Sequence, residues 1–261
     1  MTTITAKVIA DSVNPDGNRL TTLECRYPRF IHAQLLTHRQ FSRNAQSSRA
    51  CPVEKMIEEV EKDPVMPIHW GKNQRGMQAK EECNEWVCTE GYWPMPREDA
   101  WKMARDSALE IAREFAEAGY HKQIINRLLE PFAHITTIIT ATEWDNFFKL
   151  RLHEDSQPEI QRLAQVMKEA MDESDPAYAM WGGLHLPYDQ NSVVYSVACC
   201  ARVSYNNHDG TDRDPEKDRK LHDFLKENGH WSPFEHQAIA TQGDFANFKG
   251  WESYRHMNDH F

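Results

Sequence analysis

Cationic and hydroxyl side chains are concentrated in one short stretch, residues 37–49, which reads T-H-R-Q-F-S-R-N-A-Q-S-S-R. The chain carries a formal net charge of −10, yet this stretch contains no acidic residue. Arginine forks engage phosphate oxygens, and hydroxyl and amide groups complete the hydrogen bonds around them. The stretch is therefore predicted to bind an anion. The alternative is a basic face that only meets solvent.

The stretch also resembles the signature R-H-R-x-x-S-x-N-x-x-S-x-R of the flavin-dependent thymidylate synthases. Every fixed position matches except the first, where Thr37 replaces an arginine. The resemblance implies flavin-binding roles for His38, Arg39, Gln40 and Asn44. It implies nucleotide-binding roles for Gln34 and, at the phosphate, for Ser47, Ser48 and Arg49.

A second resemblance covers residues 142–160, which read T-E-W-D-N-F-F-K-L-R-L-H-E-D-S-Q-P-E-I. The run is similar to the family's second signature, and it implies that Asn146 binds the flavin. By the same resemblance Arg151 binds the substrate and is the catalytic residue that polarises the uracil ring. The residues alone also allow a capping amide and a surface arginine, because side chains five apart on a helix point roughly 140° apart. Thr140 and Thr142 stand where the family has Asn and Arg, so part of the flavin contact set is altered.

A third segment, H-K-Q-I-I-N-R-L-L-E-P at 121–131, is similar to the family stretch whose arginine holds the substrate. Arg127 takes that substrate-binding role by resemblance. The alternative is an ion pair with Glu130, three residues further along the helix, which would contribute a few tenths of a kcal/mol.

Two segments near the end of the chain resemble segments that precede the arginine-rich signature in ordinary members. They are C-A-R-V-S-Y at 200–205 and G-H-W-S-P-F-E-H at 229–236. The chain is therefore interpreted as a divergent, circularly permuted member, an arrangement that is tolerated when the original termini lie close together. The resemblance brings His236 to the flavin. Arg255 is a candidate for the guanidinium missing at Thr37, and a solvated C-terminal helix is the alternative.

The resemblance implies a transferase that methylates dUMP to dTMP, with FAD as cofactor and methylenetetrahydrofolate and NADPH as co-substrates. It also implies a homotetramer whose sites draw on several chains. Ala45 and Ala50 stand where the family usually has Glu and Tyr, which leaves alternatives open. One is another pyrimidine product, such as hydroxymethyl-dUMP or a modified dCMP. The other is a flavin or nucleotide binder without turnover.

The composition argues against several other classes. No run approaches ~18 consecutive apolar residues, and the first residues lack a signal peptide pattern, so no membrane span and a cytoplasmic location are expected. A net charge of −10 argues against nucleic-acid binding. Six cysteines without a C-x-x-C pair are typical of reduced thiols. His256 and His260 could share a metal, but no third ligand lies near, so no metal site is predicted.

The residue pattern is typical of an α+β fold, a sheet flanked by helices, in a single domain over residues 1–261. Alternating or β-branched residues predict strands at 4–10, 20–27 and 135–140. Helical spacing and end signals predict helices at 101–119, 121–129, 143–151, 158–171 and 218–228, the third capped by Thr142. Residues 52–96 are irregular and rich in aromatics that need burial, so they are predicted to form an inserted, partly helical lobe.

Overall fold

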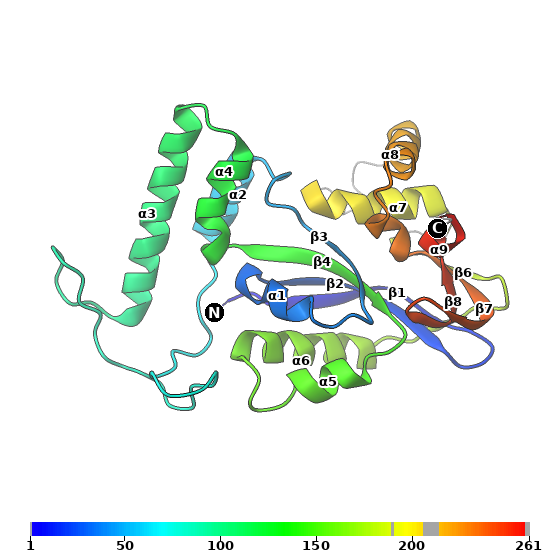
Figure 1. The fold of residues 1–261 in the computed structure, drawn as a ribbon, viewed down its shortest axis with the longest axis horizontal. Coiled ribbons are helices and arrows are strands. Elements are labelled where there is room, and N and C mark those ends of the chain that lie inside the picture. The colour runs from blue at the N-terminus through cyan, green and yellow to red at the C-terminus, as the bar shows by residue number, and fades with distance from the viewer. Residues whose placement is uncertain (1, 189–190, 206–213, 259–261) are drawn as a thin grey trace.

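The computed structural model describes residues 2–188, 191–205 and 214–258, and Figure 1 shows how its helices surround the strands. The larger sheet has the strand order β3-β4-β2-β1-β5. Its neighbouring strands are antiparallel, except that β1 and β5 are parallel. The strands are β1 (Thr5–Val13), β2 (Arg19–Pro28), β3 (Ser42–Ala45), β4 (His134–Ala141) and β5 (Ala177–Tyr178).

Strand β4 is buried along its whole length because both of its faces are covered. It is β-branched almost throughout, and such side chains suit a pleated, buried strand. On one face, Ile135 and Ile139 join Leu163 and Met167 in the main hydrophobic core. The helices on this face, below the sheet in Figure 1, are α5 (Asp145–Arg151) and α6 (Pro158–Asp172).

The C-terminal part of the chain covers the opposite face, where Ile138 packs against Cys200 and Val203. This part contains α7 (Val193–Arg202), α8 (Pro215–Glu227), α9 (Tyr254–Asn258) and the 3-10 turns Val203–Tyr205 and Ser232–Glu235. A smaller antiparallel sheet has the order β6-β7-β8. Its strands are β6 (Leu184–His185), β7 (Ala238–Phe245) and β8 (Phe248–Ser253). The last part of the chain therefore packs on the strands next to the basic stretch.

Three helices form a separate cluster at the far end of the larger sheet (Figure 1). They pack through a core of their own that contains Met56, Leu109, Ile125 and Leu129. The helices are α2 (Val53–Lys62), α3 (Arg97–Glu117) and α4 (Lys122–Leu129). Helix α3 ends as predicted, because Gly119 follows it with a φ of 81°, a conformation that favours glycine.

Between α2 and α3, residues 63–96 contain only turns and two isolated bridges. Trp70 packs against Trp101, with ring centroids 6.0 Å apart. The prediction that the aromatics of this segment are buried is wrong for Trp86, Tyr92 and Trp93, the last of which is 89% exposed. Too few helices or strands surround this segment to enclose rings of that size.

The predicted fold class, α+β with a sheet flanked by helices, is confirmed. The predicted strands and helices outside residues 63–96 are present with shifted ends. The predicted cap at Thr142 is wrong: α5 begins at Asp145, and the Thr142 hydroxyl instead accepts a hydrogen bond from the Lys249 backbone, at 3.1 Å. The short helix α1 (His32–Leu35) leads into the basic stretch.

Candidate active site

The last residue of α5, Arg151, reaches the start of the basic stretch. Its Nε donates a hydrogen bond to Nε2 of His38 at 2.9 Å. Its second terminal nitrogen donates to Oγ1 of Thr37 at 3.3 Å and to the carbonyl of Gln34 at 3.4 Å. The other terminal nitrogen makes no hydrogen bond to any described residue. These bonds hold Arg151 in one orientation, and its other terminal nitrogen still has N–H donors available for a ligand.

His38 can hold Arg151 because its ring is buried and neutral. Phe147 packs edge-on against it with ring centroids 4.9 Å apart, and Phe41 lies at 5.8 Å. Burial, together with the charges of Arg151 and Arg43, lowers the pKa of His38. A neutral imidazole that accepts at Nε2 carries its proton on Nδ1. His38, predicted to bind the flavin, and Arg151, predicted to bind the substrate, are therefore joined by a direct hydrogen bond.

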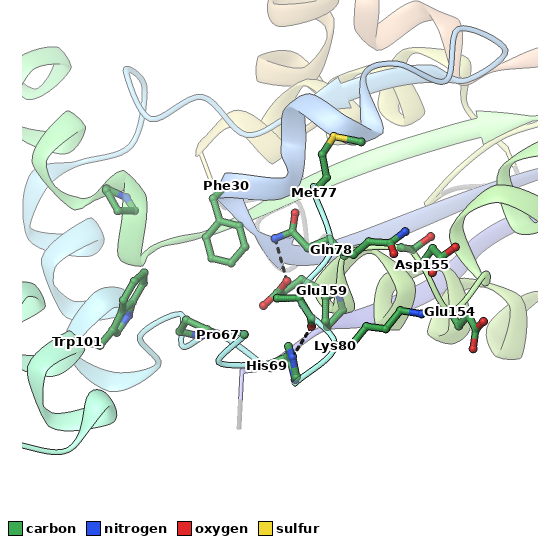
Figure 2. Close-up of a pocket in the computed structure, with 16 residues that line it drawn as sticks. Phe30, Pro67, His69, Met77, Gln78, Lys80, Trp101, Glu154, Asp155 and Glu159 are labelled. Carbon is green, nitrogen blue, oxygen red and sulfur yellow. Dashed lines mark hydrogen bonds between the residues drawn. The ribbon is translucent and has the colours of Figure 1, made fainter. Parts of the chain in front are cut away.

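A cavity of about 810 Å³ opens beside this pair, and Gln34, Lys149, Arg151 and His153 line it. A second cavity of about 800 Å³ adjoins it, since Met77 and residues 155–157 line both. Figure 2 shows the second cavity, with Phe30 and Trp101 on one side and Lys80 and Glu154 on the other. Cavities of this size accommodate a nucleotide or a cofactor ring system.

Gln34 belongs to a chain of polar contacts that connects the two cavities. Its side-chain amide donates to the amide oxygen of Gln157. The Gln157 amide donates to the buried carboxylate of Glu159 at 2.9 Å, which also accepts from the Ile68 backbone at 3.0 Å. Figure 2 labels Glu159, and a dashed line marks the hydrogen bond at its carboxylate. This series of contacts ties Ile68 of the inserted segment to α6.

Two of the four predicted phosphate residues, Ser48 and Arg127, meet beyond the other end of β3, but the group that they contact is a carboxylate. Ser48 donates to Glu130 at 2.6 Å, Arg127 donates to it at 3.1 Å, and Arg29 lies at 3.4 Å. The alternative interpretation of Arg127, an ion pair with Glu130, is therefore observed. Burial alone would raise the pKa of Glu130, but Ser48, Arg29 and Arg127 hold it below its ordinary value.

The two clusters are well separated within one chain. His38 precedes β3 and Ser48 follows it, so the extended residues 42–47 lie between them. At about 3.4 Å per residue that distance is roughly 20 Å. We call them the Arg151 cluster (Gln34, Thr37, His38, Arg151) and the Ser48 cluster (Arg29, Ser48, Arg127, Glu130).

Several of the proposed site residues keep their polar groups available. Ser47 is half-buried, and three others are exposed. None of these four side chains has a hydrogen bond or ion pair among the described residues. The three exposed residues are Arg39, Arg49 and Asn146. Gln40 is also exposed, and its backbone carbonyl accepts from Asn247 at 2.9 Å.

Asn44 and His236 are instead buried and tied to other parts of the chain. The Asn44 amide donates to the Cys200 carbonyl at 2.6 Å and accepts from Ser232 at 2.9 Å. His236 is fully buried, and its Nδ1 lies 2.8 Å from Oγ1 of Thr140. Its Nε2 has no hydrogen-bond partner in the described chain.

Arg255 pairs with Glu235, while it is Arg151 that contacts Thr37. In the described part of the chain no three His, Cys, Asp or Glu side chains are grouped as a metal site. His260, one of the two histidines considered as metal ligands, lies outside the described residues.

Two functional candidates were missed from the sequence. Glu130 was considered only as a salt-bridge partner, although it occupies the centre of the Ser48 cluster. His185 lies in no recognisable motif, yet it is fully buried with both ring nitrogens hydrogen-bonded, to Ser12 and Thr22. No local signal marks a residue whose role depends on contacts with strands more than 150 positions away.

The buried histidines predict that stability falls at acidic pH. Burial lowers the pKa of both His185 and His236 to about 3; Asp11 partly offsets this for His185, and the neighbouring His185 adds to it for His236. In the unfolded chain both would titrate near the ordinary value of about 6.5. The unfolded state therefore binds more protons below that pH, and stability is lost as pH falls from 6.5 towards 3.

At pH 5 the expected loss is about 2 kcal/mol for each of the two histidines, relative to pH 7.5. Urea unfolding at the two pH values measures it. A His185→Gln variant should show a smaller loss over the same range. An equal free energy of unfolding at pH 5 and pH 7.5 would contradict the prediction.

Comparison with known proteins identifies the family of the chain. The sequence profile of the family described as thymidylate synthase complementing protein matches residues 20–177. Because the match covers more than half of the chain, the protein belongs to this family, that of the flavin-dependent thymidylate synthases. No curated protein sequence matches the chain. None of the helices in the described residues is long and apolar enough to cross a membrane.

Solved structures with partial similarity include the UMP/dUMP methylase PolB from Streptomyces cacaoi bound with 5-Br dUMP. It is 15% identical, with a TM-score of 0.48 over 66% of this chain and 91% of that one. Another is thymidylate synthase X from Helicobacter pylori with FAD and dUMP. It is 17% identical, with a TM-score of 0.39 over 58% of this chain and 67% of that one.

Proposed function

We propose that the protein catalyses the flavin- and folate-dependent methylation of dUMP to dTMP. The observation that carries the proposal is the orientation of Arg151, which His38 holds at 2.9 Å beside a cavity of about 810 Å³. A guanidinium so placed meets the requirement of a pyrimidine site, a donor that stays protonated throughout the reaction. Gln34 lines the same cavity and supplies a neutral polar side chain for the nucleotide.

Each residue has a distinct task in this mechanism. NADPH would reduce FAD, and the reduced flavin would supply the reducing equivalents. Methylenetetrahydrofolate would supply the carbon that is transferred to the pyrimidine. Arg151 favours the build-up of negative charge on the pyrimidine ring, which is electrostatic catalysis by a preorganised donor. His38 keeps Arg151 in place. Arg39 and Asn146 are exposed and have no partner among the described residues, so their donors fit the polar and anionic groups of FAD.

The nucleotide phosphate is assigned to Ser47, Ser48, Arg49 and Arg127. The support is the observed gathering of cations around one carboxylate, because groups that hold a carboxylate also hold a phosphate. Glu130 then competes with the ligand for Ser48 and Arg127.

Substituting Glu130→Gln is expected to tighten dUMP binding about twofold to fivefold, since a partly exposed ion pair contributes ~0.5–1 kcal/mol. The change removes the competing charge and leaves the hydrogen-bonding shape. Calorimetric titration with dUMP measures it, with Glu130→Asp as the matched control that keeps the charge. Weaker binding by Glu130→Gln would place the phosphate elsewhere.

A second candidate function has specific support. The hydroxyls of Thr140 and Thr142 are both engaged inside the chain, with His236 and with the Lys249 backbone. Thr140 is bonded to both Thr22 and His236, and neither threonine supplies the amide or guanidinium that the family places near the flavin. Together with Ala45 this favours, as the alternative, a changed product at carbon five of the ring, either hydroxymethyl-dUMP or a modified dCMP.

We also propose that the working unit is a homotetramer. The Arg151 and Ser48 clusters of one chain lie roughly 20 Å apart along extended chain, which is longer than a mononucleotide. A single nucleotide would then take its phosphate contacts from one chain and Arg151 from another. We also propose a cytoplasmic location, because the six cysteines of the sequence include no C-x-x-C pair and their spacing is typical of reduced thiols.

The circular permutation is a further part of the proposal. The two C-terminal segments assigned to positions before the signature in ordinary members pack directly on it. Cys200 and Ser232 both bind Asn44, and His236 binds Thr140. These contacts support the proposed permutation, because they hold the two C-terminal segments against the signature and the strand beside it.

Mass spectrometry of the nucleotides tests the function. The purified protein is incubated with FAD, NADPH and methylenetetrahydrofolate, and dUMP and dCMP are offered together. We expect dUMP to be consumed and dTMP to form. A hydroxymethyl product or a modified dCMP would establish the alternative function, and the absence of any product would leave only a binding protein.

A further inference from the structure

A continuous chain of hydrogen bonds joins five buried side chains that lie far apart in the sequence. Ser12 Oγ lies 2.9 Å from Nδ1 of His185, whose Nε2 lies 2.8 Å from Oγ1 of Thr22. Thr22 Oγ1 lies 2.8 Å from Oγ1 of Thr140. The chain ends at 2.8 Å between Thr140 Oγ1 and Nδ1 of His236. Ser12 is 7% exposed and the other four residues 1% or less.

The protons in this chain can be arranged in only two ways. Each hydroxyl donates one proton, and each neutral imidazole has one nitrogen that donates and one that accepts. Both histidines are neutral near pH 7, since burial lowers their pKa values to about 3. Every hydrogen bond therefore runs from Ser12 towards His236, or every one runs back.

The two directions differ in what they leave unsatisfied. If Ser12 donates to His185, the series ends with Thr140 donating to His236 Nδ1, and only the Nε2–H of His236 has no partner. In the reverse direction His236 Nε2 is an acceptor without a partner. Ser12 then also loses its acceptor, because its hydroxyl makes no other hydrogen bond to the described residues. The first direction therefore leaves one polar group without a partner among the described residues and the reverse direction leaves two, so the first direction is favoured.

We propose that Ser12, His185, Thr22 and Thr140 fix His236 as the tautomer protonated at Nε2, so that it offers a neutral N–H donor to an acceptor atom of the bound flavin. The identity of the ligand rests on the proposed function, whereas the tautomer does not. Ser12 and His185 are positioning residues that act through the hydroxyls between them and His236. Both lie outside residues 20–177, the part matched by the family profile.

Nitrogen-15 NMR of protein labelled on histidine tests the proposal at pH 7, because the two ring nitrogens of a neutral imidazole resonate differently. The wild-type spectrum should show His236 protonated at Nε2 alone. Ser12→Ala removes the donor that sets the direction, and it should produce a mixture of both His236 tautomers, four hydrogen bonds away. Ser12→Thr restores a hydroxyl and should restore the single tautomer.

Affinity for FAD, measured by fluorescence titration, is the second readout. It should weaken about threefold to tenfold in Ser12→Ala and recover in Ser12→Thr. The matched control is Thr21→Val on β2, next to Thr22. It removes a buried hydroxyl that donates to Asp11 at 3.0 Å and is not part of the hydrogen-bonded chain. This control should leave the His236 tautomer and FAD affinity unchanged.

A wild-type His236 protonated at Nδ1 would overturn the proposal, and this spectrum does not depend on how well the variants fold. A single unchanged tautomer in Ser12→Ala would also overturn it. If the tautomers behave as expected but wild-type protein does not bind FAD, the hydrogen-bonded chain stands and the proposed flavin function fails. Unchanged FAD affinity in Ser12→Ala, with the tautomer altered, would remove the link between the chain and the flavin.

Discussion

Arg151→Ala is expected to lower kcat/KM for dUMP by about 30- to 1,000-fold, which corresponds to the ~2–4 kcal/mol lost with one preorganised charge donor. The loss should fall mainly on kcat, because Arg151 acts on charge that develops during the reaction. Binding of the nucleotide phosphate should survive, since that group is assigned to the Ser48 cluster. Steady-state kinetics and equilibrium binding of dUMP separate the two effects.

Two comparisons sharpen this result. Arg151→Lys keeps a positive charge but lacks the planar guanidinium that binds His38, Thr37 and the Gln34 carbonyl together, so it should recover little activity. Arg113→Ala removes an exposed arginine that pairs with Glu61 on the helices of the separate cluster, and it should leave turnover unchanged. Full turnover by Arg151→Ala would refute the assignment of the active site.

Phe147→Ala is expected to lower the free energy of unfolding by ~3–5 kcal/mol, the usual range for removing a buried phenyl ring. Phe147 is 2% exposed and packs against His38, Phe41 and Phe148, with ring centroids 4.9, 5.1 and 5.5 Å away. The loss combines the transfer of the ring to water with the cavity left beside His38. Urea unfolding of the protein without cofactor measures it.

The neighbouring Phe148 offers a matched control, because it lies on the same helix but is only partly buried. Phe148→Ala should cost clearly less stability than Phe147→Ala. Since Phe147 also supports the ring of His38, its loss should reduce kcat/KM at temperatures where the variant is still folded. Equal destabilisation by the two substitutions would mean that Phe147 is not a core residue of the site.

The elements with strong periodicity could be predicted from the sequence. The β-branched run in β4 and the apolar spacing in α3 and α6 identify their type, because burial on a strand or a helix face requires those patterns. The cap at Thr142 could not be settled in this way. Its hydroxyl is engaged by the backbone of Lys249, more than 100 residues further along the chain.

In the candidate site, too, contacts between residues far apart in the sequence could not be predicted. Motif spacing identified His38 and Arg151, but the bond between them joins residues 113 positions apart and depends on how α5 folds back beneath the sheet. Glu130 and His185 also have contacts that no local pattern shows, Glu130 with Ser48 and His185 with Ser12 and Thr22. The exposed rings of Trp86 and Trp93 were not predictable either, because composition does not reveal whether enough chain lies nearby to cover them.

The separation of the Arg151 and Ser48 clusters has a consequence for inheritance. In an assembly of the proposed kind, one chain damaged at Arg151 and another damaged at Arg127 can still form an intact site between them. Two gene copies could then each carry damage in a different cluster, one at Arg151 and the other at Arg127, and together still produce an active assembly. A single damaged copy would in turn impair the chemistry of its undamaged neighbours. Selection at these positions would act on the assembly rather than on the individual chain.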